Sequence, residues 1–115
     1  METIDAKLAR YREIIKRLLM EWAAIPYAVE GLRQYPFFDE PNDRYAVITE
    51  GWLGSERVLS IILNLEIING KVWLQADNTD AVFARKLEEN GIPKAEIVLG
   101  FRSPEMRTYT EYAAA

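Results

Sequence analysis

The pair Asn69-Gly70 lies between two runs in which aliphatic residues alternate with other residues. Type I′ hairpin turns favour this pair, because both central residues of such a turn need positive φ. A two-residue loop fixes the register, so Leu65 should oppose Leu74 on one face of an antiparallel hairpin. The other predicted pairs are Ile68 with Lys71, Ile67 with Val72, Glu66 with Trp73, Asn64 with Gln75 and Leu63 with Ala76.

The first strand of this hairpin, predicted over Glu56–Ile68, is unusually long. From Leu59 onward its odd positions are all aliphatic, which predicts a single buried face. These positions are Leu59, Ile61, Leu63, Leu65 and Ile67. At the rise of an extended chain the strand would exceed about 40 Å, so we expect a bend or a bulge partway along it.

Two further strands are predicted upstream. Arg44–Glu50 shows the two-residue alternation of a strand, and Gly51 begins a Gly-rich loop that would carry Trp52. Leu32–Phe38 is extended in character, and Pro36 confines it to a sheet edge because proline cannot donate to a central ladder. The sequence therefore predicts a meander of about four antiparallel strands.

Residues 4–23 are predicted to form one helix, because apolar residues recur at spacings of three and four. Thr3 is a candidate N-cap, and Pro26 opposes continuation of the helix. The apolar stripe should cover the aliphatic face of the hairpin. The stripe comprises Ile4, Leu8, Tyr11, Ile15, Leu18 and Trp22, widened by Ile14, Leu19 and Ile25.

The last third of the chain predicts a second helix over about Asp80–Asn90, with Gly91 as the residue that ends it. A further helical turn follows at Pro93–Glu96, and Ile97–Leu99 is expected to be extended and buried. Two tyrosines in Arg107–Ala115 favour docking of the tail. We conclude that the chain is one α+β domain, residues 1–115, with an N-terminal helix packed on the meander sheet.

Composition excludes several kinds of chemistry. The 115 residues contain no cysteine and no histidine, which excludes thiolate chemistry, imidazole bases and most zinc sites. The formal net charge of −4 is unfavourable for a free nucleic-acid binder, because such proteins neutralise phosphates. The run Val58–Ile68 is too short and too polar to span a membrane. Acidic Glu2 and Asp5 stand where a signal peptide would be cationic, so a cytoplasmic protein is predicted.

Acidic clusters do not predict a metal or catalytic site. Asp39–Asp43 lacks the ligand spacing of a calcium loop, and we interpret it as a solvated turn. Asp77–Asp80 is interpreted as capping for the following helix. Glu50 and Glu66 lie within predicted strands, and Glu66 should face Trp73 on the less apolar side of the hairpin, so we interpret it as part of an exposed pair and not as a catalytic acid. No catalytic residue, metal ligand or cofactor is predicted.

Surface residues favour binding over catalysis. Tryptophan and arginine are enriched at interface hot spots, so Trp52 with Arg57 and Arg102 with Arg107 are candidate anchors for a protein partner. Met20 adds an apolar residue to the charged side of the helix. Direct DNA contact is the alternative, through helix cations. These cations are Arg10, Arg12, Lys16 and Arg17.

With these motifs in order, the chain resembles the fdxN element excision controlling factor family, of the XisI type. Matching stretches run over nearly the whole length. They are Arg10-Tyr11-Arg12, Ile14-Ile15, Leu18-Leu19, Ile25-Pro26, Gly51-Trp52 with Gly54, Arg57-Val58, Asn69–Gln75, Asn78-Thr79-Asp80, Gly91–Lys94, Ile97–Phe101, Tyr109-Thr110 and Tyr112-Ala113.

The resemblance implies a small cyanobacterial accessory protein for programmed excision of a DNA element during heterocyst development, where a separate recombinase cuts and rejoins the DNA. It also implies a companion of the XisH type, which resembles a nuclease fold. It supplies no catalytic residues. Three hypotheses follow: a regulator that binds the recombinase or the companion, a direct DNA-binding factor, and a small-molecule-binding or hydrolytic domain. A homo-oligomer is also compatible with the sequence.

Overall fold

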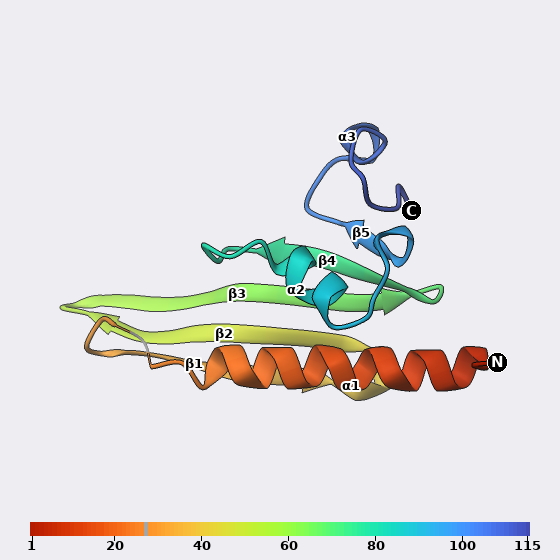
Figure 1. The fold of residues 1–115 in the computed structure, drawn as a ribbon. Coiled ribbons are helices and arrows are strands. Elements are labelled where there is room, and N and C mark those ends of the chain that lie inside the picture. The colour runs from red at the N-terminus through yellow and green to blue at the C-terminus, as the bar shows by residue number, and fades with distance from the viewer. Residues whose placement is uncertain (27) are drawn as a thin grey trace.

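One long helix and five strands form the frame of the chain in the computed structural model, which describes residues 1–26 and 28–115 (Figure 1). The elements in chain order are α1 (Ile4–Ala23), β1 (Leu32–Asp39), η1 (Glu40–Asn42), β2 (Arg44–Leu53), β3 (Glu56–Ile68), β4 (Lys71–Asp77), α2 (Phe83–Glu89), η2 (Lys94–Glu96), β5 (Ile97–Leu99) and α3 (Pro104–Arg107).

The strands follow chain order across the sheet, and the first four are antiparallel. The α+β fold and the edge position of β1 are therefore confirmed. The fifth strand, β5, lies parallel to β4. Parallel neighbours need a crossover connection, which α2 supplies here, and short Ile97–Leu99 becomes a strand rather than only a buried segment.

The Asn69-Gly70 hairpin has the predicted turn, with φ of 50° at Asn69 and 78° at Gly70. Leu65 opposes Leu74, as predicted. Farther from the turn the predicted register is wrong. Asn64 opposes Ala76 and Leu63 opposes Asp77, because a bulge in β4 leaves Gln75 without an opposite residue.

A second bulge, in β3, changes which residues of that strand face the core. Val47 opposes Leu63, but its neighbour Ile48 opposes Ile61, so Ile62 is an extra residue in β3. Beyond this bulge the odd positions point to the opposite face. The prediction that all odd residues share one buried face is wrong for Leu59 and Ile61, which are 62% and 46% exposed.

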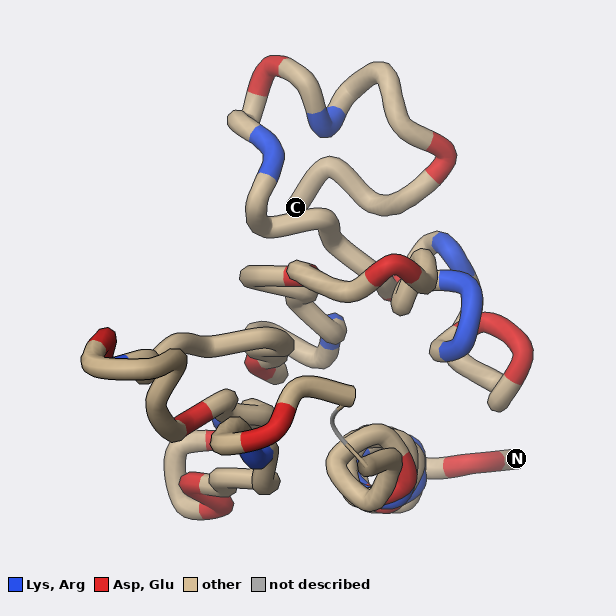
Figure 2. The backbone as a smooth tube through the Cα atoms, turned by 90° about the vertical axis from the view of Figure 1, so that its left-hand side faces the viewer, with Lys and Arg blue, Asp and Glu red and all other residues tan. Residues whose placement is uncertain are grey.

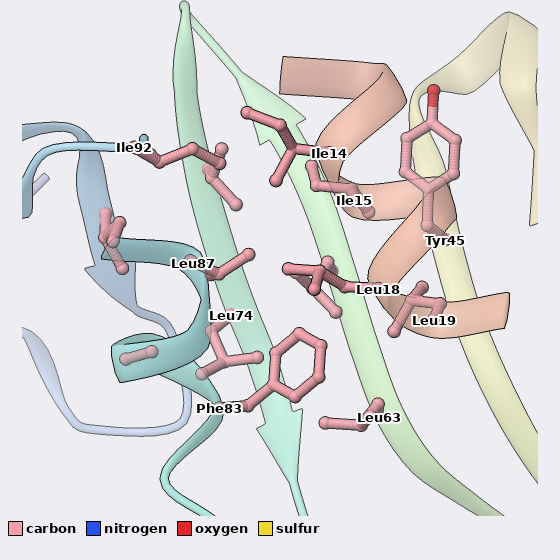
Figure 3. Close-up of a cluster of buried hydrophobic side chains, with 14 of the residues drawn as sticks. Ile14, Ile15, Leu18, Leu19, Tyr45, Leu63, Leu74, Phe83, Leu87 and Ile92 are labelled. Carbon is pink, nitrogen blue, oxygen red and sulfur yellow. The ribbon is translucent and has the colours of Figure 1, made fainter. Parts of the chain in front are cut away.

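The hydrophobic core lies between the sheet and the helices α1 and α2, which cover the same face of the sheet (Figure 3). Helix α1 contributes its predicted stripe except at Ile4, its exposed first residue. Ile25, which was predicted to widen the stripe, lies beyond the end of the helix and is exposed as well. Phe83 and Leu87 from α2 complete the cluster with aliphatic residues of β3 and β4. The buried strand residues of this cluster are Tyr45, Val47, Leu63, Leu65, Val72, Leu74 and Ile97.

Helix α2 begins at Phe83, three residues later than predicted. The reason is the way its first amide is satisfied: Asp77 at the end of β4 accepts a hydrogen bond from the Phe83 N–H at 2.9 Å. Asp77 also accepts from Thr79, which holds the intervening residues in a turn. Asp77 thus satisfies one amide of α2, but none of the residues in Asp77–Asp80 is the N-cap as predicted, because Val82 holds that position. The helix ends before Gly91, whose φ is 108°.

Strand β2 continues through Gly51 to Leu53, so the predicted loop at Gly51–Ser55 is confined to Gly54 and Ser55. Trp52 therefore lies in a strand, opposite Arg57. The C-terminal tail docks as predicted. Ala113 forms a bridge with Val98, and the Tyr112 hydroxyl donates to Glu88 at 2.6 Å.

Candidate functional site

The cations of α1 that were candidate DNA contacts are all bonded within the protein. Figure 2 looks along this helix and shows basic and acidic segments together on it. Arg10 forms an ion pair with Glu2 at 2.8 Å, and Arg17 donates to Asn90 at 2.9 Å. Lys16 lies 2.9 Å from Glu40. A phosphate would have to compete with these partners, which reduces the net gain from binding it.

Arg12 joins the helix to the end of the β1–β2 connection. Its guanidinium donates two hydrogen bonds to Asp43, at 2.8 and 3.0 Å, and Tyr45 donates a third at 2.9 Å. The bonds from Arg12 hold the pKa of Asp43 below its ordinary value, against the opposing effect of burial. Burial and the neighbouring carboxylate raise the pKa of Tyr45 to about 12. Asp43 has φ of 52°, a left-handed conformation that Asn also tolerates.

We predict that Asp43→Asn destabilises the fold by about 1 kcal/mol at neutral pH, because it removes a charge-assisted pair while keeping the backbone conformation. The folded-state pKa of Asp43 is lowered, so this stabilisation is complete above the unfolded pKa, near 4, and is lost as pH falls through the folded value. Urea unfolding at pH 7 and below pH 3 measures it. An equal difference at both pH values would contradict this assignment.

A second polar cluster surrounds the buried Tyr11. Its hydroxyl donates to Glu96, which also pairs with Lys7 at 2.6 Å. Burial alone would raise the pKa of Glu96, but the hydrogen bonds from Lys7 and Tyr11 outweigh it and lower that pKa. The cluster borders an open hollow of about 620 Å³ that Arg10 and Lys94 also line. Each polar group here is paired with another, so the cluster fastens α1 to η2.

The other acids predicted to be structural have structural partners. Glu50 accepts from Arg33 at 2.7 Å and from Arg57 at 3.3 Å, and the bond from Arg33 is the main reason that the pKa of Glu50 is lowered. Glu66 pairs with Arg44 at 3.3 Å. Asp39 accepts from Asn42 within its turn. Among residues 1–26 and 28–115, no group of three or more acidic residues is placed to hold a metal ion.

The candidate anchors for a partner divide into exposed and packed residues. Trp52 is 52% exposed with the Arg57 guanidinium 5.5 Å from its ring, and Arg102 lies 5.2 Å from the ring of Phe101. Arg107 instead stacks 4.9 Å from the Trp73 ring and donates to the Arg102 carbonyl. It therefore supports the C-terminal segment.

Met20 is 51% exposed and lies on α1. It is therefore separate from both pairs of anchors, which lie on the outer sheet face and on the C-terminal segment. That Met20 contacts a partner stays a prediction.

Two exposed surfaces were missed by the sequence interpretation. The first is on the outer face of the sheet, where Phe37 and Ile61 are exposed. The alternation in β1 could have placed Phe37 there.

The second surface is the C-terminal patch, which we define as Phe101, Arg102, Met106 and Tyr109, and of which the sequence interpretation named Arg102 but not the three apolar members. Its three apolar members are 44%, 52% and 80% exposed. Short α3, capped by the Ser103 hydroxyl, displays Met106. No periodic pattern in so short a segment could have predicted which of its side chains face outward.

The fold and these surfaces define a small α+β domain with one helix-covered sheet face, one open sheet face and a docked C-terminal segment. None of the helices in the described residues has the length and apolar character needed to cross a membrane. The sequence model of the family described as XisI protein matches residues 5–114, and the chain belongs to this family.

Two solved structures from Anabaena variabilis are similar to this chain. The first, fdxN element excision controlling factor XisI, is 34% identical, with 95% of this chain and 99% of that chain covered and a TM-score of 0.82. The second, a XisI-like protein, is 32% identical, with 94% and 99% covered and a TM-score of 0.88. No curated protein matches the chain.

Proposed function

We propose that this protein is a non-catalytic accessory factor that controls excision of a DNA element through contacts with another protein. The link to excision comes from the similar structure described as an excision controlling factor. The observation that supports protein contact is the C-terminal patch, where three large apolar side chains are exposed within nine residues beside a stacked arginine. Exposed aromatic, Met and Arg side chains are typical of interface centres.

The partner in this proposal is a XisH-type companion or a recombinase complex. A short docked segment is suited to such a contact, because Ala113 and Tyr112 fix its end on the sheet and on α2. The site therefore needs little ordering on binding, which favours affinity. Direct DNA contact has less support, since the four helix cations are bonded to neighbouring groups of this chain.

Co-purification with the companion, and separately with the recombinase, tests the proposal. We expect Met106→Ala with Tyr109→Ala to weaken capture at least about tenfold, the usual effect of removing hot-spot residues. Ile4→Ala is the matched control, because Ile4 is an apolar side chain that is 72% exposed on another surface. Trp52→Ala in the same assay decides whether the end of the β2–β3 hairpin joins the contact.

Two outcomes would contradict the proposal. In the first, neither protein is captured by the unaltered chain. In the second, the purified chain alone binds duplex DNA with an affinity that falls steeply with salt, and charge removal at Arg17 reduces that slope. The second outcome would support the direct DNA-binding hypothesis instead.

A further inference from the structure

The outer face of the sheet, opposite α1, carries four rows of side chains across β1, β2 and β3. Pairing between strands defines each row, because directly opposed residues of antiparallel strands share a face. The rows are Arg33, Glu50 and Leu59; Tyr35, Ile48 and Ile61; Phe37, Ala46 and Asn64; and Asp39, Arg44 and Glu66.

The two middle rows of this outer face are apolar apart from Asn64, and all of the charged residues lie in the two end rows. Phe37 and Ile61 are 59% and 46% exposed, as is unusual for large apolar side chains gathered on one face. In the described part of the chain α1 and α2 both lie on the other side of the sheet (Figure 1). The middle rows therefore form a surface that a further layer can bury.

We propose that the outer face binds the same face of a second copy of this chain, with the strands of the two copies antiparallel. A twofold axis in the plane between two stacked sheets can run across the strands or along them. When the axis runs across the strands, each end row of one copy lies over the other end row of the second copy. Arg33 then faces Asp39, and Glu50 faces Arg44, so opposite charges meet at four places in the dimer.

The other orientation brings like charges together. With the axis along β2, Glu50 lies over Glu50, Arg44 over Arg44, and Asp39 over Glu66. Juxtaposed like charges at an interface disfavour that arrangement strongly. In the antiparallel arrangement Leu59 faces Glu66, whose charge is already paired with Arg44 at 3.3 Å. Charge complementarity thus selects the antiparallel orientation.

Shape complementarity agrees with this choice. Ala46 is small, and the outer face has a hollow of about 220 Å³ beside it, bordered by Phe37, Arg44 and Asn64. In the antiparallel dimer the middle rows exchange, so Ile48 of the second copy lies over Ala46 and can fill the hollow. Tyr35 then lies over Phe37 of the second copy. Alternation of large and small side chains between facing layers is how sheets pack.

The size of the face sets the expected strength. Three strands and the four rows span roughly 30 Å by 14 Å, which corresponds to a total buried area on the order of 1,000 Å². This is at the low end for specific interfaces, so we expect a reversible dimer with a dissociation constant on the order of micromolar.

Sedimentation of the purified chain alone, from about 1 µM to several hundred µM, tests dimerisation. We expect the apparent mass to rise from 13.3 kDa toward twice that value. Phe37→Asp and Asp39→Arg should each weaken association at least about tenfold, while Ile4→Asp, on α1, should not. Combining Asp39→Arg with Arg33→Glu should restore association. Circular dichroism confirms that each variant folds. The proposal is overturned if the chain stays monomeric at every concentration, or if it dimerises and these variants leave the strength of association unchanged.

A single spin label decides the orientation, because the chain has no cysteine of its own. Ser55→Cys places the label in the β2–β3 turn, at one end of the outer face. The antiparallel dimer separates the two labels by about 50 Å, whereas the other orientation brings them within about 15 Å. A short distance overturns the proposed arrangement. Neither experiment uses a partner protein or DNA, so the result is independent of the proposed function.

Discussion

Replacing Gly51 by alanine is expected to destabilise the protein by about 3 kcal/mol or more. Gly51 has φ of 151°, which alanine rarely adopts, and a Cβ there would collide with the backbone carbonyl of Gly31. The collision lies where β1 and β2 pair, and the Trp52 N–H donates to that same Gly31 carbonyl at 3.0 Å. To relieve this collision, β1 and β2 must separate at this end of their pairing. Denaturant unfolding monitored by tryptophan fluorescence measures the loss.

Gly54→Ala is the matched control for this effect. Gly54 also has positive φ, 61°, but a Cβ there would meet no atom within 4 Å. Its substitution should cost only the conformational penalty, about 1 kcal/mol. If both variants lose the same stability, the close approach of β1 to β2 at Gly31 is wrong.

The features predicted correctly are those that depend on neighbouring residues, such as turns and helix caps. The turn at Asn69-Gly70 set the pairing of Leu65 with Leu74, because a two-residue loop leaves one register. Thr3 caps α1 through a hydrogen bond from the Ala6 N–H, as its position predicted. Each of these features depends on residues close together in the sequence.

The length of β3 predicted a bend or a bulge partway along it, and the bulge at Ile62 confirms this. The position of that bulge, and the bulge at Gln75, depend on the three-dimensional arrangement and left no local signal such as glycine or proline. A reason for the change of face at Ile62 is length. Helix α1 has 20 residues and spans about 30 Å, whereas β3 has 13 residues and exceeds 40 Å. The helix therefore cannot cover the whole strand. Aliphatic residues past its reach, Leu59 and Ile61, lie on the face that α1 does not cover.

The candidate surfaces were predictable only in part for the same reason. Residue type marked Trp52, Arg57 and Arg102 as candidate anchors, and the structure leaves all three exposed. Residue type could not show that Arg107 stacks on Trp73, since these residues meet only when the tail docks on β4. Nor could it show that Arg12 is bonded to Asp43, 31 positions away.

Leu65→Ala is expected to lower the free energy of unfolding by about 2–5 kcal/mol, the cost of a cavity in a closely packed core. Leu65 is fully buried and lies in the same cluster as Leu19 of α1. Leu59→Ala removes the same atoms from the same strand, yet Leu59 is 62% exposed, so the loss should stay within about 0.5 kcal/mol. Urea unfolding of the two variants in dilute solution, where self-association is negligible, measures the difference.

This pair tests the bulge at Ile62 directly, because the two leucines stand at odd positions of one strand and an unbroken strand would place both on the core face. Comparable losses for the two variants would mean that β3 is continuous and that Leu59 packs under a helix. The outer face would then lose Leu59 and Ile61, and the antiparallel dimer built on its four rows would lose part of its apolar centre. A large loss at Leu65 with little change at Leu59 supports both the change of face and the open surface that follows from it.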